Sequence, residues 1–592
     1  MTRSTQLHTT FLSFSSQHPR RSSHHCVASA AYAAEPRLSK GAVVSKKTPS
    51  PSPFRKMSKV DDKNDLWRMN QAKFEPSIWG DFFLSYSNPL AYSNSQESME
   101  ERAEYLKKEV AKLIVNSRTD SLSEKLHLLD VLERLCLDHL FEEEIDAVLD
   151  EISNADVSDC ELHTVALWFY LLRKHRHRVS PDVFLKFRDE DGIFEAEDAR
   201  DLLSLYNAAH LMTHGERILD EAISFTKRQL RSLMPKVVEG SIAHDINCAL
   251  EIPLPRRVRI YEAKYFMSTY EKGASVNEII MELAMLSYNI MQIHHQQELK
   301  IITRWWKDLQ LQTRLTFARD RVVECYFWIA GVYFEPCYSR GRIILTKVLA
   351  IVSILDDIYD VYGSPDECEQ FTKCIESWDP KMGCYLPELL RFAFEKILDT
   401  YQNIDDELLL EEKYRMSYLK NFTIDLVRAY NKEVKWREEG YIPGTIDEHL
   451  QVSARSGMDD IASKDCFDWV CSVPKIVESL CIILRLSDDL KSYERERLTS
   501  HVASTIDSCM KEHNISIEMA REKIHLLIEE SWKDFNGEWL DSGNNQPIQL
   551  MERIFNLTRT MEFFYKKDDA YTNGHTVKDN IYSLFVEPVM MT

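Results

Sequence analysis

Apolar residues recur along most of the chain at steps of three and four positions, the spacing that places side chains on one face of an α-helix. An early face of this kind consists of Leu106, Val110, Leu113 and Ile114. A later segment shows the same spacing at Leu526, Leu527 and Trp532, with Ile524. Few segments alternate as a strand does, and glycine is rare, at 16 of 592 residues. The pattern predicts an all-α protein built from many helices of medium length.

Breaks in the helical pattern indicate how the chain is divided. Pro253 and Pro255 stand close together, and proline interrupts a helix because it lacks a backbone N–H. We expect a domain boundary between this pair and about residue 280. Further breaks fall at residues 180–181, 440–443 and 541–544, and no repeat of fixed short period appears. A chain of 592 residues is long enough for two or more domains.

Charge and cysteine content restrict the possible partners. The formal net charge is −21 at pH 7, whereas nucleic acids and anionic membranes attract basic proteins. No run of 18 apolar residues occurs, so we expect no membrane-spanning helix. The thirteen cysteines include no Cys-x-x-Cys pair, which favours free thiols in a reducing compartment over a zinc site. The acidic residues either keep the protein soluble or bind metal, and the total charge does not distinguish these.

The first 56 residues differ in composition from the rest. No Asp or Glu occurs before residue 35, and Ser, Thr, His and Arg dominate. An acid-poor leader rich in Ser and Arg, without an apolar core, is typical of an organellar transit peptide and predicts a plastid protein. The alternative is a plain disordered tail. A chain translated from Met57 would lack the leader and would be cytoplasmic.

An acidic motif ends a strongly apolar segment, residues 343–361. Asp356 and Asp360 are four positions apart, so on an α-helix both carboxylates face the same side, next to Asp357. Repulsion between them is costly without a cation. Oxygen ligands alone favour Mg²⁺, which retains water and phosphate ligands. In so acidic a chain the alternative is a solvated helix end.

A second motif follows another apolar segment, residues 479–486. Asp488, Ser492 and Glu496 recur every four residues and form one stripe of oxygen ligands along a helix. A solvated charged face is again the alternative, but that does not explain why the polar stripe continues an apolar face.

Together the two motifs resemble the paired metal motifs of class I terpene synthases, and the chain is similar to the sesquiterpene-synthase-type subfamily of flowering plants. The resemblance extends from about Lys73 to Pro588. Further segments close to family signatures are residues 74–81 (Phe-Glu-Pro-Ser-Ile-Trp-Gly-Asp), 201–211 (Asp-Leu-Leu-Ser-Leu-Tyr-Asn-Ala-Ala-His-Leu) and 436–443 (Trp-Arg-Glu-Glu-Gly-Tyr-Ile-Pro). The order and spacing of these segments make coincidence implausible.

The resemblance implies an amino-terminal helical domain at residues 66–275 and a carboxy-terminal catalytic α-bundle at residues 276–592. It implies that the enzyme ionises a linear prenyl diphosphate and yields a cyclised or quenched terpene. Three Mg²⁺ ions are expected, with Mn²⁺ as a possible substitute, and the protein is expected to be a monomer. The implied metal ligands are Asp356, Asp360, Asp488, Ser492 and Glu496.

Arginines are expected to bind the diphosphate together with the motif residues Asp356, Asp360 and Asp488. The resemblance implies that Arg319 and Arg321, in an Arg-x-Arg triplet 37 and 35 positions before Asp356, close over the diphosphate. Guanidinium groups offer forked donors that match phosphate oxygens. The alternative is a surface ion-pair cluster. Arg485 matches another diphosphate-contacting position and stands in an otherwise apolar run, so it needs an anionic partner.

Three further residues match positions around the pocket of the family. Trp328 and Tyr571 are implied to line it, since aromatic faces stabilise cations without acting as nucleophiles. Asp569 and Tyr571 lie in a segment implicated in capping the pocket and moving protons. The alternative for both aromatic residues is ordinary core packing.

The chain departs from the family in two places. After Glu496 the family continues with basic residues and a glycine, whereas this chain has Arg497-Leu498-Thr499-Ser500. An Arg pair that precedes the first Trp in many cyclising monoterpene synthases is replaced by Met69 and Asn70. These departures put active-site closure and the isomerisation of geranyl diphosphate in doubt.

Other activities rank lower. No Asp-x-Asp-Asp motif appears, because residues 189–192 read Asp-Glu-Asp-Gly, so protonation-initiated cyclisation is not expected. A chain-elongating prenyltransferase would need a second Asp-Asp-x-x-Asp where Ser492 stands. A catalytically dead binding or scaffold protein remains a rival. The body of the chain favours C15 farnesyl diphosphate over C10 geranyl diphosphate, whereas the leader favours a plastidial monoterpene or diterpene synthase.

Overall fold

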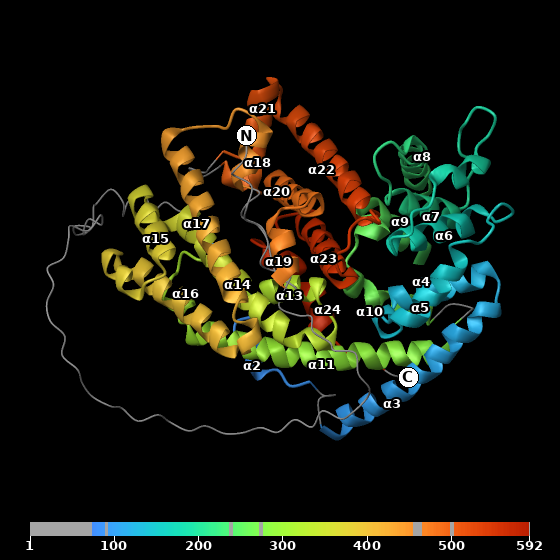
Figure 1. The fold of residues 1–592 in the computed structure, drawn as a ribbon, viewed down its shortest axis with the longest axis horizontal. Coiled ribbons are helices and arrows are strands. Elements are labelled where there is room, and N and C mark those ends of the chain that lie inside the picture. Colours follow the sequence, from blue (N-terminus) through green and yellow to red (C-terminus); the bar gives the residue numbers. More distant parts are fainter. Residues whose placement is uncertain are drawn as a thin grey trace.

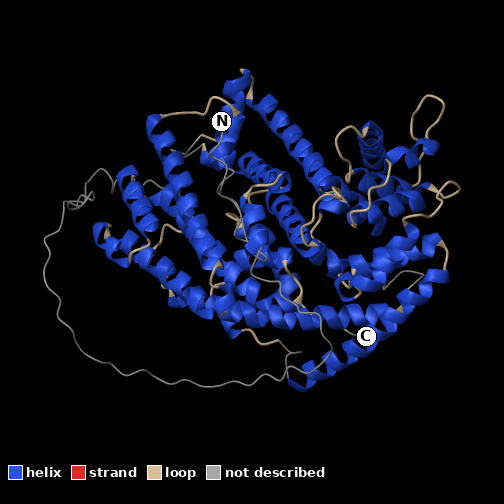
Figure 2. Cartoon of the chain, viewed as in Figure 1, coloured by secondary structure: helices blue, strands red, loops and turns tan. Residues whose placement is uncertain are grey.

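Helices make up the regular structure of the protein. The structure, a computed structural model, describes residues 74–88, 93–235, 241–271, 276–453, 464–497 and 503–590. Within these ranges every regular element is a helix, and one isolated antiparallel bridge joins Arg188 to Phe194 (Figure 2). The all-α prediction is therefore confirmed. The predicted leader, residues 1–56, and the alternative start at Met57 lie outside the described residues.

The first group of helices gathers at one end of the molecule, on the right of Figure 1. These helices are α2 (Phe82–Ser85), α3 (Ser93–Asn116), α4 (Leu122–Arg134), α5 (Glu142–Ile152), α6 (Leu162–Lys174), α7 (Ala199–Ala209), α8 (Arg217–Leu233), α9 (Ser241–Glu251) and α10 (Arg259–Tyr270). Helix α2 is the exception, since it lies under the second group. Short 3₁₀ turns join several of them: η1 (Ser117–Thr119), η2 (Asp138–Leu140), η3 (Pro181–Phe187) and η4 (Leu254–Arg256).

The second group contains both predicted metal motifs. Its helices are α11 (Glu278–Asp308), α12 (Leu311–Arg314), α13 (Val322–Val332), α14 (Ser339–Asp357), α15 (Pro365–Ser377), α16 (Glu388–Glu407), α17 (Arg415–Glu439), α18 (Ile446–Ser453), α19 (Lys464–Cys471), α20 (Lys475–Glu496), α21 (Thr505–His513), α22 (Ile517–Trp539), α23 (Ile548–Tyr565) and α24 (Lys578–Phe585). Its shorter turns are η5 (Pro336–Tyr338), the π-helix η6 (Ile358–Tyr362), η7 (Pro380–Tyr385), η8 (Leu410–Glu412) and η10 (Gly574–Val577).

Helix ends follow the capping residues of the sequence. Ser121 begins α4 with a reciprocal capping box to Glu124, and Ser364 begins α15 in the same way with Glu367. Helix α17 ends at Gly440, whose φ of +59° is the left-handed conformation that glycine adopts at low cost. These capping residues set the start of α4 and α15 and the end of α17.

Helix α11 joins the two groups along the base of the molecule (Figure 1). It packs against α3 of the first group and against α13, α14 and α24 of the second. Arg256 of the first group also pairs with Glu529 of α22 at 2.7 Å. One continuous cluster of buried apolar side chains runs from Trp79 to Val586. The predicted division into residues 66–275 and 276–592 stays a prediction.

No helix among the described residues is both long and apolar enough to cross a membrane.

Candidate active site

The first acidic motif spans a change in helix type. Asp356 is in the last turn of α14, and Asp360 is in the five-residue π-helix that follows. The Gly363 amide donates to the Ile358 carbonyl at 2.7 Å, a hydrogen bond that spans five residues. A Cβ at Gly363 would lie 2.5 Å from the Cys368 sulfur, so a larger residue at this exit would require Cys368 to shift. The sequence predicted a regular α-helix through both aspartates, and the π-turn, a device common at functional sites, replaces it.

Asp356 and Asp360 are nevertheless close enough to repel each other. Burial raises the pKa of Asp356, repulsion from Asp360 raises it further, and Arg319 opposes both. Helix α17 secures the π-turn, since Arg437 donates to the Asp360 carbonyl at 3.1 Å and to the Tyr359 carbonyl at 3.3 Å. The signature segment 436–443 therefore supports the first motif.

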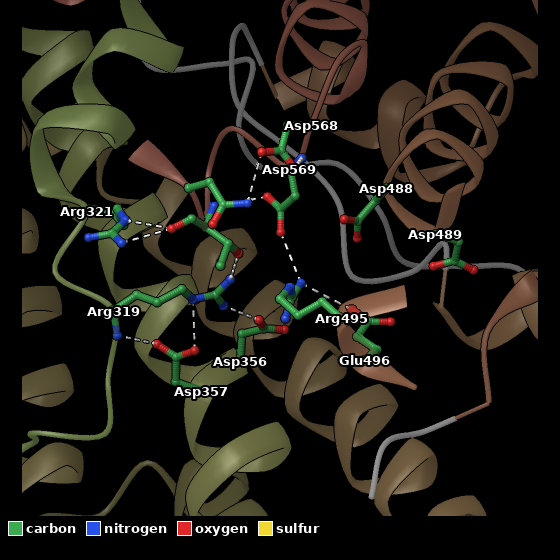
Figure 3. A network of polar contacts seen from close by, with 12 residues as sticks. Arg319, Arg321, Asp356, Asp357, Asp488, Asp489, Arg495, Glu496, Asp568 and Asp569 are labelled. Atoms are coloured by element: carbon green, nitrogen blue, oxygen red, sulfur yellow. Dashed lines mark hydrogen bonds and ion pairs between the residues drawn. The ribbon is translucent and has the colours of Figure 1, made fainter. Parts of the chain in front are cut away.

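Arg319 is buried against the first motif and is no surface residue. Its backbone amide donates to Asp357 Oδ2 at 2.7 Å, and its guanidinium forms ion pairs with Asp356 and Asp357, the latter at 2.9 Å (Figure 3). Its Nη1 also donates to Thr572 Oγ1 at 3.1 Å. Arg319 thus links the first motif to the α23–α24 loop (residues 566–577).

Arg321 points to main-chain carbonyls instead. It donates to the Thr572 carbonyl through Nε and Nη2, at 3.2 and 2.8 Å, and to the Asp320 carbonyl at 2.9 Å. Its Nη2 also donates to the Glu75 carbonyl at 2.8 Å. In this conformation Arg321 joins the start of the described chain to the α23–α24 loop, and Figure 3 shows it on the far side of that loop from Asp488.

The second motif lies along α20. Arg485 pairs with Asp488 at 2.5 Å and with Asp489, so the anionic partner that its apolar neighbours required consists of two carboxylates. Asp489 is buried and accepts hydrogen bonds from the Thr505 amide, at 2.7 Å, and from its hydroxyl. Asp489 therefore fixes the start of α21 and is not available to the site.

Ser492 is fully buried and its Oγ has no hydrogen-bond partner. A buried hydroxyl without a partner is costly, and such atoms in native proteins often await a ligand. Burial also raises the pKa of Asp488 to about 8, with repulsion from Asp569 and Glu496 adding to the effect and Arg485 opposing it. The Ser492 hydroxyl and the Asp488 carboxyl group, which resists ionisation, are on the same helix, and these oxygen donors fit a site for a divalent cation.

The carboxylates are not gathered into a finished metal site. In the part of the chain that the structure describes, no three His, Cys, Asp or Glu side chains are grouped to hold a metal ion. Arginines neutralise the two motifs instead, as Figure 3 shows for Asp356 and Glu496. The oxygen donors of Asp356, Asp360, Asp488, Ser492 and Glu496 still fit a hard cation.

The α23–α24 loop brings Asp569 and Tyr571 to the site. Arg495 pairs with Asp569 at 3.0 Å, and Asp569 accepts a hydrogen bond from the Thr572 amide at 2.9 Å. The Tyr571 ring centre lies 5.2 Å from the guanidinium carbon of Arg319, and its hydroxyl lies 3.4 Å from the Cys325 sulfur. Asp569, Tyr571 and Thr572 of this loop are all buried.

Trp328 stands on α13 in a cluster of aromatic rings. Its ring centre is 4.4 Å from that of Phe564, 6.0 Å from that of Tyr571 and 6.1 Å from that of Tyr565. Trp328 and Tyr571 thus lie within one aromatic cluster that also packs the core, and their role in lining a pocket stays a prediction.

Three residues near the motifs were not expected from the sequence to take part in the site. Glu433 on α17 is close enough to the motifs that burial and repulsion from Asp360 and Asp356 raise its pKa to about 8, with Arg485 opposing. Asp357 was named only beside Asp356 and Asp360, and Arg495 was given no role. A helical projection of residues 430–437 would have placed Glu433 one turn from Arg437, on the same helix that supports the first motif.

Comparison with known proteins agrees with this geometry. Residues 78–250 match the family described as "Terpene synthase, N-terminal domain", and residues 307–534 match "Terpene synthase family, metal binding domain". The chain is 63% identical to alpha-terpineol synthase, chloroplastic, of Zea mays, over 88% of this chain and 86% of that protein. It is 42% identical to beta-sesquiphellandrene synthase of Sorghum bicolor, over 88% of this chain and 96% of that protein.

Its fold is similar to that of isoprene synthase from grey poplar, solved in complex with three Mg²⁺ ions and dimethylallyl-S-thiolodiphosphate. The TM-score is 0.77 and the sequence identity 32%, over 87% of this chain and 99% of that one.

Proposed function

The chain belongs to the terpene synthase family, and from this premise we propose that it ionises a linear prenyl diphosphate and converts the carbocation into a volatile terpene. It is a lyase: the carbon–oxygen bond breaks, and the diphosphate leaves with the electron pair. The observation that carries the proposal is the pair of acidic motifs, each neutralised by a buried or half-buried arginine, Arg319 or Arg485.

The five oxygen donors of the motifs would hold the cations: Asp356, Asp360, Asp488, Ser492 and Glu496. Bound Mg²⁺, or Mn²⁺ in its place, would neutralise the leaving diphosphate, and the resemblance implies three such ions. Glu433 on α17 lies near the same charge cluster, and repulsion from Asp360 and Asp356 adds to the burial that raises its pKa to about 8.

Arg319 and Arg485 are suited to bind the diphosphate. Each already pairs with two carboxylates, Arg319 through Nη2 and Nε and Arg485 through Nη2 alone. Phosphate oxygens match the forked donors that a guanidinium offers. Arg321 instead holds the α23–α24 loop through the Thr572 carbonyl. The carboxylates of Asp356, Asp360 and Asp488 contribute through the cations that they bind.

The carbocation needs a dry, aromatic environment. Trp328 and Tyr571 present ring faces that stabilise positive charge without adding to it as nucleophiles. Asp569 holds the loop over the pocket through Thr572 and stands near the reacting centre as a proton acceptor. The final step is either loss of a proton or capture of one water molecule.

We propose geranyl diphosphate as the substrate. The 63% relative makes alpha-terpineol, a ten-carbon alcohol, and its chloroplastic name agrees with the Ser- and Arg-rich leader. The protein would therefore act in plastids. The family resemblance also implies that it is a monomer. Farnesyl diphosphate is the second candidate, supported by the relative that makes the fifteen-carbon beta-sesquiphellandrene.

Incubation of the protein from Met57 onward with C10, C15 and C20 diphosphates tests the proposal. We expect Mg²⁺-dependent release of diphosphate and the richest volatile product from the C10 substrate. Preference for the C15 substrate would replace geranyl by farnesyl diphosphate. Longer diphosphates formed in the presence of isopentenyl diphosphate would indicate a prenyltransferase, and no release from any substrate would indicate a binding protein.

A further inference from the structure

Three guanidinium groups face the acidic cluster, and each bridges one predicted metal ligand and a second carboxylate. The three triads are Arg319 with Asp356 and Asp357, Arg485 with Asp488 and Asp489, and Arg495 with Glu496 and Asp569. The first two arginines belong to the proposed diphosphate site. The third repeats their arrangement at the other end of the second motif.

Arg495 differs from the other two in exposure. Its side chain is 39% exposed, against 10% for Arg319 and 22% for Arg485. Its Nη2 lies 3.0 Å from Asp569 and 3.4 Å from Glu496, and Figure 3 shows it between those two carboxylates. Exposed ion pairs are weak and exchange their partners readily, so Arg495 is the most easily released of the three.

Arg495 also lies between the two motifs, because its partner Asp569 does. Figure 3 shows Arg495 between Asp356 of the first motif and Glu496 of the second. The Arg495 guanidinium therefore lies close to carboxylates of both motifs.

A cation held by Glu496 competes with Arg495 for the same carboxylate. Once Glu496 turns to a divalent ion, the guanidinium of Arg495 remains beside that ion and is repelled by it unless an anion joins them. The leaving diphosphate is the anion that this site admits. The free donors of Arg495 then match its oxygens in the forked geometry that guanidinium favours.

We propose that Arg495 contacts the diphosphate as a third arginine, exchanging its carboxylate partners Glu496 and Asp569 for the substrate. This proposal rests on the proposed function and names a further substrate-binding residue for that site.

The competing explanation is that Arg495 only latches the α23–α24 loop through Asp569. The two explanations differ for Asp569→Asn. If Arg495 only holds the loop, the loss of either partner breaks the same ion pair. Asp569→Asn and Arg495→Gln would then weaken pyrophosphate binding alike. A diphosphate contact is lost only in Arg495→Gln, whereas Asp569→Asn removes a competitor for the guanidinium and retains the amide acceptor for Thr572.

The test is calorimetric titration of the full chain with inorganic pyrophosphate in excess Mg²⁺, without substrate turnover. We expect the dissociation constant to rise about tenfold in Arg495→Gln, for the loss of one charge-assisted hydrogen bond, and by less in Arg495→Lys. Asp569→Asn should bind as tightly as the wild type or more tightly. Arg521→Gln is the matched control. Arg521 on α22 pairs at 2.7 Å with Glu494 of α20, the helix that carries Arg495, and its side chain is similarly exposed, at 36%.

Unchanged pyrophosphate affinity in Arg495→Gln, or equal weakening in Arg495→Gln and Asp569→Asn, would overturn the proposal and leave the enzyme assignment intact. Absence of Mg²⁺-dependent pyrophosphate binding in the wild type would overturn the proposed function as well. Melting temperatures without ligand show whether each variant is folded, and Arg495→Lys serves the same comparison if the glutamine variant is not.

Discussion

The backbone amide of Arg319 donates to the buried carboxylate of Asp357 at 2.7 Å, and the same carboxylate pairs with the Arg319 guanidinium at 2.9 Å. Asp357 therefore sets both the chain path and the side-chain direction of the first arginine of the site. Asp356 and Asp360 are the implied metal ligands of this motif. Asp357, the aspartate between them, positions Arg319 instead.

Asp357→Ala should lower both stability and turnover. The substitution leaves the buried guanidinium without its principal partner, and breaking a buried ion pair in this way costs about 3 kcal/mol. We expect the free energy of unfolding, measured by denaturant titration, to fall by about that amount. Asp356→Ala is the comparison: Asp356 is more exposed and repelled by Asp360, so turnover should vanish with little loss of stability. Equal destabilisation by both variants would contradict this assignment.

Ser492→Ala should weaken metal binding without harming the fold. The Ser492 hydroxyl is buried without a partner, so its removal from the metal-free protein relieves an unsatisfied group. We expect an unchanged or higher melting temperature in EDTA, and a rise of about tenfold or more in the Mg²⁺ concentration for half-maximal turnover. A lower melting temperature with normal Mg²⁺ dependence would identify Ser492 as a structural residue.

Arg321→Gln should loosen the start of the described chain and leave pyrophosphate binding unchanged. The Arg321 donors bind the carbonyls of Thr572 and Glu75, so their loss frees residues 74–88 from the α23–α24 loop. Hydrogen exchange of residues 74–88 should accelerate, while pyrophosphate affinity in Mg²⁺ stays within about twofold. Arg319→Gln provides the contrast and should lose affinity. If both variants lose pyrophosphate affinity equally, Arg321 closes over the diphosphate as the family resemblance implied.

Glu324 should make stability fall between about pH 4.5 and pH 7. Burial raises the pKa of its carboxyl from 4.5 to about 7, despite attraction from Arg321. Because the folded state binds this proton more tightly than the unfolded state, its contribution is full below pH 4.5 and is lost as pH rises to 7, a change of roughly 3 kcal/mol. Glu324→Gln cannot ionise, so in EDTA it should be more stable than wild type at pH 8.

At pH 4 the Glu324→Gln and wild-type proteins should have similar free energies of unfolding. A constant difference between them from pH 4 to pH 8 would mean that Glu324 does not titrate in this range. Gly574 leaves room for the Glu324 carboxyl group, because a Cβ at position 574 would lie 2.4 Å from it.

The sequence was sufficient for the helical class and for the identity of the two motif-bearing segments, because both follow from local spacing. It was not sufficient for the π-turn at Ile358, which depends on the close approach of Gly363 to Cys368. Nor did it indicate that Thr572 and Glu75, about 250 residues from Arg321 on either side, meet at that arginine. Such contacts arise from tertiary packing, and spacing along a helix carries no information about them.

The hydrogen bond that Arg321 donates to the Glu75 carbonyl limits where the chain can be shortened. Phe74 precedes Glu75, and its ring centre lies 5.2 Å from the guanidinium carbon of Arg319, so two consecutive residues contact the two arginines that precede α13. Any shortening that removes Phe74 and Glu75 would take these contacts from both arginines.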